Sequence, residues 1–104
     1  QHMNINVTEQ HIKDGCTRNS YFCPVARALK DAGLEEPSVS RAYIFFKKNG
    51  RLHEINSPLS VHRFIHLFDN GYTCVIEPFS FELNLDEAID IHDLENRGPL
   101  EFKA

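Results

Sequence analysis

The chain of 104 residues has no tryptophan, only five glycines and only three cysteines, and the scarcity of the last two argues against particular classes of function. None of the glycines forms a G-x-G-x-x-G or P-loop pattern, so no phosphate-cradling loop is expected. The cysteines include no C-x-x-C pair for redox chemistry, and no G-x-S-x-G turn presents a serine nucleophile. These absences predict a protein that is not an enzyme.

Neither an excess of basic charge nor a long apolar run is present. The formal net charge is −4 at pH 7, which argues against a nucleic-acid partner, because phosphate-backbone binding needs a strongly basic face. No apolar run approaches the roughly 20 residues that span a bilayer, and no basic-then-apolar start suggests a signal peptide. We therefore expect a cytoplasmic protein with no membrane partner.

The composition that is present fits one globular domain. Hydrophobic residues make up 41% of the chain and eight of them are phenylalanine, which predicts a phenylalanine-rich core. Gln1-His2-Met3 is interpreted as the remnant of an expression tag, with the natural chain starting at Met3. The expected division is residues 1–3 as that remnant, residues 4–85 as a single α+β domain, and residues 86–104 as an acidic C-terminal arm.

Three stretches carry helix signals. Thr8 is expected to cap a brief helical turn that Gly15 ends. Cys23 precedes Pro24, a residue suited to the first helical position. The apolar residues after Cys23 recur at i, i+3, i+4 and i+7: Val25, Ala28, Leu29 and Ala32. Ser57-Pro58 repeats the cap-then-proline arrangement, with Ser57 expected as the cap, and the same spacing follows it at Val61, Phe64, Ile65 and Phe68.

Strand signals occupy the remaining regular stretches. Residues 4–7 and 79–85 alternate polar and apolar side chains, as a half-buried strand does. Asn49-Gly50 between residues 41–48 and 51–56 predicts a β-hairpin with a type I′ turn. Residues 35–40 are expected to be a connector broken by Pro37. The order β-α-β-β-α-β predicts an α+β two-layer sandwich, with two helices on a mostly antiparallel four-stranded sheet.

The hairpin supplies the candidate binding residues. A two-residue turn sets Phe45 opposite Glu54 and Lys47 opposite Leu52, and it leaves Tyr43, Phe45 and Leu52 on the side away from the core. A second apolar face is typical of an interface, so we predict a protein-binding surface made by Tyr43, Phe45 and Leu52, with Glu54 and Lys47 as its polar rim. The competing expectation is that the C-terminal arm covers this face through its apolar residues: Ile89, Ile91 and Leu94.

A metal site built on the cysteines is the alternative. Zinc sites usually contain a closely spaced C-x₂-C pair, whereas six residues separate Cys16 from Cys23. His62 and His66 lie four apart, but Arg63 stands where the H-E-x-x-H pattern needs glutamate. We therefore expect no metal and no cofactor, with Cys23 as a helix entrance. The alternative function is a small metal-binding or nucleic-acid-processing protein using Cys16, Cys23 and histidines.

Four segments together resemble a group of small uncharacterised proteins encoded by phages and prophages. They are HIKDG (His11 to Gly15), CPVARAL (Cys23 to Leu29), FIHLFDNG (Phe64 to Gly71) and EPFSFEL (Glu77 to Leu83). The resemblance implies the cytoplasm of an infected bacterium. It also implies an accessory protein that inhibits or redirects a component of the host or of its defence by binding. The expected partner is a host or phage protein, or a second copy in a homodimer.

Overall fold

The computed structural model describes residues 1–92 and contains helices together with two antiparallel sheets. The elements follow in the order β1 (His2–Val7), α1 (Glu9–Asp14), α2 (Pro24–Asp31), β2 (Glu35–Val39), β3 (Tyr43–Lys48), β4 (Arg51–Asn56), α3 (Leu59–Asp69), η1 (Thr73–Val75), β5 (Phe79–Asn84), η2 (Leu85–Glu87) and β6 (Ile89–Asp90), where η marks a 3₁₀ turn. The larger sheet has the strand order β2-β3-β4-β6, and β1 pairs with β5. The predicted α+β class is confirmed.

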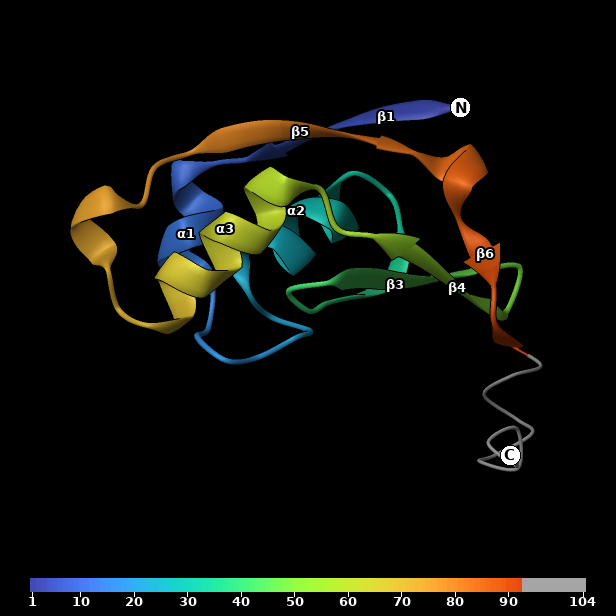
Figure 1. The fold of residues 1–104 in the computed structure, drawn as a ribbon, viewed down its shortest axis with the longest axis horizontal. Helices are drawn as coiled ribbons and strands as arrows, with labels where there is room; N and C mark the ends of the chain where they lie inside the picture. The colour runs from blue at the N-terminus through green and yellow to red at the C-terminus, as the bar shows by residue number, and fades with distance from the viewer. Residues whose placement is uncertain (93–104) are drawn as a thin grey trace.

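The arrangement of the sheets differs from the single sheet that was expected. Figure 1 shows α2 and α3 lying between the β1-β5 ribbon and the four-stranded sheet, so the chain has three layers instead of two. The first strand and the strand after α3 pair with each other and not with the hairpin. Alternation predicts that a strand buries one face, but it does not specify the neighbouring strand.

The larger sheet takes its outer strand from a segment that was expected to be a connector. β2 pairs with β3 through Ser38 opposite Phe45 and Val39 opposite Ile44, and its register shifts between Glu35 and Ser38. β2 lies at the edge of the sheet, where a proline is tolerated because its missing N–H is not needed for pairing. Pro37 therefore belongs to a bulged edge strand and does not end the strand.

The hairpin forms as predicted. Phe45 faces Glu54 and Lys47 faces Leu52, in the register expected from a two-residue turn. The turn residue Asn49 has φ 55°, and Gly50 beside it also has a positive φ, as a type I′ turn requires.

The helix ends follow from their capping residues, with one correction. Thr8 caps α1 by accepting a hydrogen bond from the His11 backbone N–H (3.3 Å), as expected. The N-cap of α3 is Pro58, which makes no side-chain cap hydrogen bond. Ser57 was expected to act as that cap, but its hydroxyl donates to the Ser40 carbonyl (3.3 Å) because it lies against the start of the hairpin.

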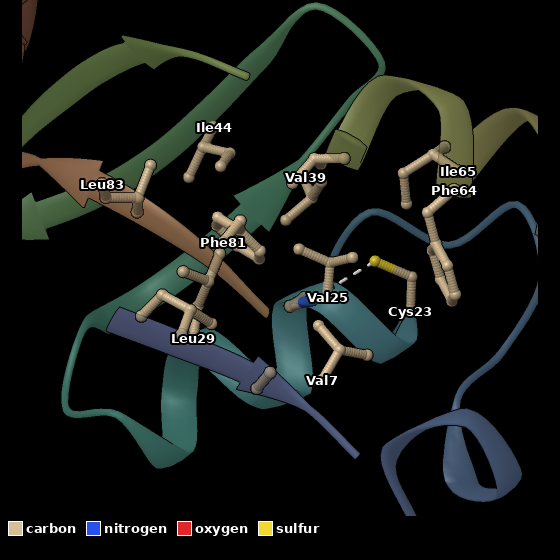
Figure 2. Close-up of a cluster of buried hydrophobic side chains, with 14 of the residues drawn as sticks. Val7, Cys23, Val25, Leu29, Val39, Ile44, Phe64, Ile65, Phe81 and Leu83 are labelled. Carbon is tan, nitrogen blue, oxygen red and sulfur yellow. Dashed lines mark hydrogen bonds between the residues drawn. The ribbon is translucent and has the colours of Figure 1, made fainter. Parts of the chain in front are cut away.

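One hydrophobic core joins all three layers. Figure 2 shows Leu29 of α2, Ile44 of β3 and Phe81 of β5 within the same buried cluster. The predicted apolar stripe of α3 is buried throughout, whereas Ala32, the last member of the stripe predicted for α2, is exposed because α2 ends at Asp31. The residues that make up the core come from both sheets and both longer helices: Ile5, Val7, Cys23, Val25, Ala26, Ala28, Leu29, Val39, Ile44, Phe46, Ile55, Val61, Phe64, Ile65, Phe68, Phe81 and Leu83.

Both ends of the described chain take part in sheets. The segment interpreted as a tag remnant contributes His2 and Met3 to β1, where Met3 pairs with Leu83. After β5 the chain turns through η2 and adds β6 to the free edge of β4. The end of the predicted acidic arm, from residue 93 onward, lies outside the described residues.

Candidate protein-binding surface

The candidate surface is the side of the hairpin that faces away from the helices, and we call it the outer face. It is made by the five predicted residues: Tyr43, Phe45, Lys47, Leu52 and Glu54. Successive side chains of a strand point to opposite sides, so the residues between them, such as Ile44 and Phe46, are buried against the core. The alternation therefore separates an inner face of the hairpin from the outer face.

Aromatic and aliphatic side chains remain accessible at this surface. Tyr43 is 41% exposed, and its ring lies 6.2 Å from the ring of Phe45, measured between centroids. Phe45 and Leu52 are half-buried within the sheet, although none of the helices in residues 1–92 covers them (Figure 1). This combination supplies a contact area that is already ordered before a partner binds.

A groove crosses the outer face beside β2. Its volume is about 430 Å³, and its lining includes Tyr21, Glu36 and Ser38 in addition to three residues of the outer face. Tyr21 reaches the sheet because the Val39 N–H donates to the Ser20 carbonyl (2.9 Å), which holds the loop before α2 against β2. Sequence reasoning missed these three residues because it expected a connector in place of β2. The signal available was an adjacent aromatic pair, Tyr21-Phe22, in a polar loop.

The two charged residues of the outer face have different surroundings. The Lys47 ammonium lies 3.7 Å from the Glu36 carboxylate, an exposed ion pair that contributes little to stability. Within residues 1–92, Glu54 makes no ion pair and no side-chain hydrogen bond, although it is half-buried between Phe45 and Ile89 of the adjoining strands. Among the described residues, Glu54 is therefore a carboxylate on an apolar surface with no cation paired to it.

β6 widens the outer face and does not cover it. The strand pairs at the edge of β4, with Ile89 opposite Glu54, and the Ile91 N–H donates to the Leu52 carbonyl (2.9 Å). Ile89 is 61% exposed, so it adds apolar area beside Glu54. The competing expectation named three residues of the arm. Ile89 does not cover the outer face, Ile91 is half-buried beside Leu52, and Leu94 lies outside the described residues.

An ion pair holds β6 in this place. The Arg51 Nε donates to a carboxylate oxygen of Asp90 (2.6 Å) across the sheet edge. This hydrogen bond, together with one from the His92 backbone N–H, lowers the pKa of the Asp90 carboxyl below its ordinary value.

The cysteines occupy separate environments. Cys23 is 2% exposed and caps α2, where its sulfur accepts a hydrogen bond from the Ala26 N–H (3.4 Å). Burial raises the pKa of the Cys23 thiol, so it stays protonated and is a poor metal ligand. Cys16 and Cys74 are exposed, and nowhere in residues 1–92 do three histidine, cysteine, aspartate or glutamate side chains come together as a metal site would require. This geometry favours the role of Cys23 as the residue that begins helix α2.

Alkylation should distinguish the buried thiol from the exposed ones. In native protein we expect Cys16 and Cys74 to react with iodoacetamide at rates near that of a free cysteine. Cys23 should react at least about a thousandfold more slowly, because its labelling requires the core to open. Mass spectrometry of digested samples measures each rate, and urea-unfolded protein, in which all three thiols react alike, is the control. Rapid labelling of Cys23 would contradict this assignment and restore the cysteine pair as a candidate site.

A cavity larger than the groove beside β2 lies elsewhere, between the tip of the hairpin and η2. It has a volume of about 600 Å³, and Phe46, Leu34 and Leu85 form part of its lining. Two of its polar groups are already engaged within the chain, since the N-terminal amine bonds Asp86 (2.5 Å) and His53 Nδ1 bonds the Arg51 carbonyl (3.0 Å). We place the candidate site on the outer face instead, because accessible aromatic side chains gather there.

Among residues 1–92 no helix is long and apolar enough to cross a membrane. Comparisons of the chain with protein-family models, with curated proteins and with solved structures find no match. The resemblance to phage-encoded proteins accordingly stays a prediction, and the candidate site depends on the geometry above.

Proposed function

We propose that this chain is a non-enzymatic accessory protein that acts by binding another protein through its outer face. The observation that carries the proposal is the accessible aromatic and aliphatic surface of the hairpin, with its groove beside Tyr21. Aromatic residues are enriched at the energetic centres of interfaces, because they bring large contact areas at a small cost in side-chain entropy. The half-buried Glu54 adds a charge that a partner must match, and this gives selectivity.

From the sequence resemblance we propose that the protein acts in the cytoplasm of a phage-infected bacterium. There its binding would inhibit or redirect a component of the host or of its defence. The alternative role in metal binding or nucleic-acid processing has less support, because Cys23 is buried and its thiol is engaged at the start of α2.

Replacing Tyr43 and Phe45 with serine tests the proposal. The double variant should stay folded, with a melting temperature close to that of the parent, because Tyr43 is partly exposed and neither side chain belongs to the core. Binding of a partner captured from infected-cell lysate should weaken at least about a hundredfold, since truncating a hot-spot aromatic costs roughly 2 kcal/mol or more. Calorimetric titration of the purified partner measures the loss.

Leu59→Ser is the matched control, because Leu59 is 70% exposed on α3 and lies outside the outer face. It should bind like the parent. An unfolded double variant would mean that Tyr43 and Phe45 belong to the core. A folded double variant with parental affinity would move the binding surface elsewhere, and the acidic C-terminal arm would be the next candidate.

A further inference from the structure

Four residues of the outer face form a pattern that is complementary to itself. Phe45 lies opposite Glu54, and two positions further along the strands Lys47 lies opposite Leu52. These residues are the corners of a rectangle on the sheet, with the two apolar side chains on one diagonal and the two opposite charges on the other. From strand geometry the rectangle measures roughly 6.8 Å along the strands and about 4.8 Å across them.

From this pattern we infer that the partner of the outer face is a second copy of this chain, bound around a two-fold axis that runs along the Phe45–Leu52 diagonal. The inference rests on the proposed function, since it names the partner of the same surface. In such a dimer a contact between two different residues occurs twice, because residue i of one copy contacts residue j of the other and the reverse, whereas a residue on the axis contacts its own counterpart once. Phe45 then packs on the partner copy's Phe45, and Leu52 on its Leu52.

The same axis brings Lys47 of each copy opposite Glu54 of the other. The Lys47 ammonium of each copy reaches the Glu54 carboxylate of the other, and this provides the cation that Glu54 lacks within residues 1–92. Lys47 has three N–H donors, so it retains Glu36 while it binds a second carboxylate. One two-fold rotation therefore buries the apolar side chains and also pairs the charged ones.

The sheet geometry agrees with a known packing class. A diagonal of this rectangle is inclined about 35° to the strands, so the two-fold axis makes the strands of the two copies cross at roughly 70°. That angle approaches the orthogonal class of sheet packing, in which strands of facing sheets cross near 90°.

The interface must extend beyond the four corners. A stable dimer buries roughly 800 Å² on each partner, which is a modest part of the 6786 Å² exposed by one chain. Tyr43 continues the face along β3, while Tyr21 and Ile89 flank it at β2 and β6, each more than half exposed. These three residues provide apolar area around the four corners.

Charge reversal tests the inference. Sedimentation velocity of the parent chain should show a dimer, and Lys47→Glu or Glu54→Lys alone should weaken dimerisation at least about tenfold, because each variant places like charges together twice. The two single variants mixed in equal amounts should form a heterodimer, because one carries two carboxylates and the other two ammonium groups at the charged corners. The double variant Lys47→Glu/Glu54→Lys should dimerise like the parent, because its charged positions are again complementary. Circular dichroism checks that each variant is folded. Lys13→Glu, a reversal on the exposed surface of α1, should leave the dimer unchanged.

The outcomes separate this inference from the proposed function. A monomeric parent chain, or a dimer that both single variants retain, would overturn the inference, and so would an equal mixture that fails to associate. The proposed function would survive each of these results if Tyr43→Ser/Phe45→Ser still lost a captured protein of another kind. If the parent is a dimer, the mixture associates and Tyr43→Ser/Phe45→Ser is monomeric, the inference holds and the outer face is a protein-binding surface, as the proposed function requires.

Discussion

Replacing Leu29 with alanine is expected to lower the free energy of unfolding by about 3 kcal/mol, within the range of about 2–5 kcal/mol for buried leucines. Leu29 is 0% exposed and lies on α2, between the β1-β5 ribbon and the four-stranded sheet. Removing its side chain leaves a cavity where the layers meet, because neither sheet can close the space without moving α2. The same change should lower the melting temperature by more than 10 °C, since 1 kcal/mol corresponds to roughly 4–8 °C for a domain of this size.

Leu59→Ala is the matched control for this prediction. It removes the same atoms from a leucine that is 70% exposed, so the free energy of unfolding should change by less than about 0.5 kcal/mol. Urea titration followed by circular dichroism measures both variants. Equal, small effects would contradict the placement of α2 in the middle layer.

Gly15→Ala is expected to lower the free energy of unfolding by about 1–3 kcal/mol, because it overpacks the junction between α1 and α2. A β-carbon on Gly15 would lie 2.5 Å from two ring carbons of Pro24, and 2.7 Å from the Pro24 nitrogen. The backbone at Gly15 has φ −74° and ψ 151°, values that alanine readily adopts, so the cost is steric and not conformational. The glycine predicted as the end of α1 thus also allows the start of α2 to approach.

Lys13→Ala, an exposed change two residues earlier on α1, should leave the free energy of unfolding within about 0.5 kcal/mol of the parent value. Urea titration again makes the comparison. A stable Gly15→Ala variant would show that Pro24 can move away without loss, and therefore that the contact between α1 and the start of α2 is loose.

The Leu29→Ala and Gly15→Ala variants also help to interpret the variants of the outer face. Leu29 and Gly15 lie apart from the outer face, so either variant should bind a partner with parental affinity at temperatures where it remains folded. Loss of affinity confined to outer-face variants would then report on contacts and not on stability.

The helices and the hairpin could be predicted because their signals are local. The spacing of Val61, Phe64, Ile65 and Phe68 places four side chains on one side of a helix whatever they pack against. Asn49 and Gly50 readily adopt positive φ, asparagine because its short polar side chain tolerates that conformation and glycine because it has no β-carbon, and the turn length then determines the register of Phe45 and Glu54. A segment of about three helical turns is enough to predict the helix, and one tight turn is enough to predict the hairpin.

The pairing of strands could not be predicted in the same way. β1 and β5 alternate as expected, but their pairing joins Ile5 to Phe81, which are far apart in the sequence. The β2 segment, which contains Pro37, has no strand signal by itself and becomes a strand because β3 offers it an edge. Pairing depends on which hydrophobic faces meet after the chain collapses, and no short window contains that information.

The candidate surface, too, was predictable from local sequence in part and depends on long-range packing for the rest. The sequence alone determined which side chains of the hairpin share its outer side, since alternation and a two-residue turn place Phe45 beside Glu54 in any fold that keeps the hairpin. Only the tertiary structure decided that α2 and α3 cover the opposite side, that Tyr21 and β2 form a groove beside Phe45, and that β6 extends the face at its edge. The reason is physical: local backbone geometry sets the direction of each side chain, whereas its exposure depends on long-range packing of the core, to which the whole chain contributes.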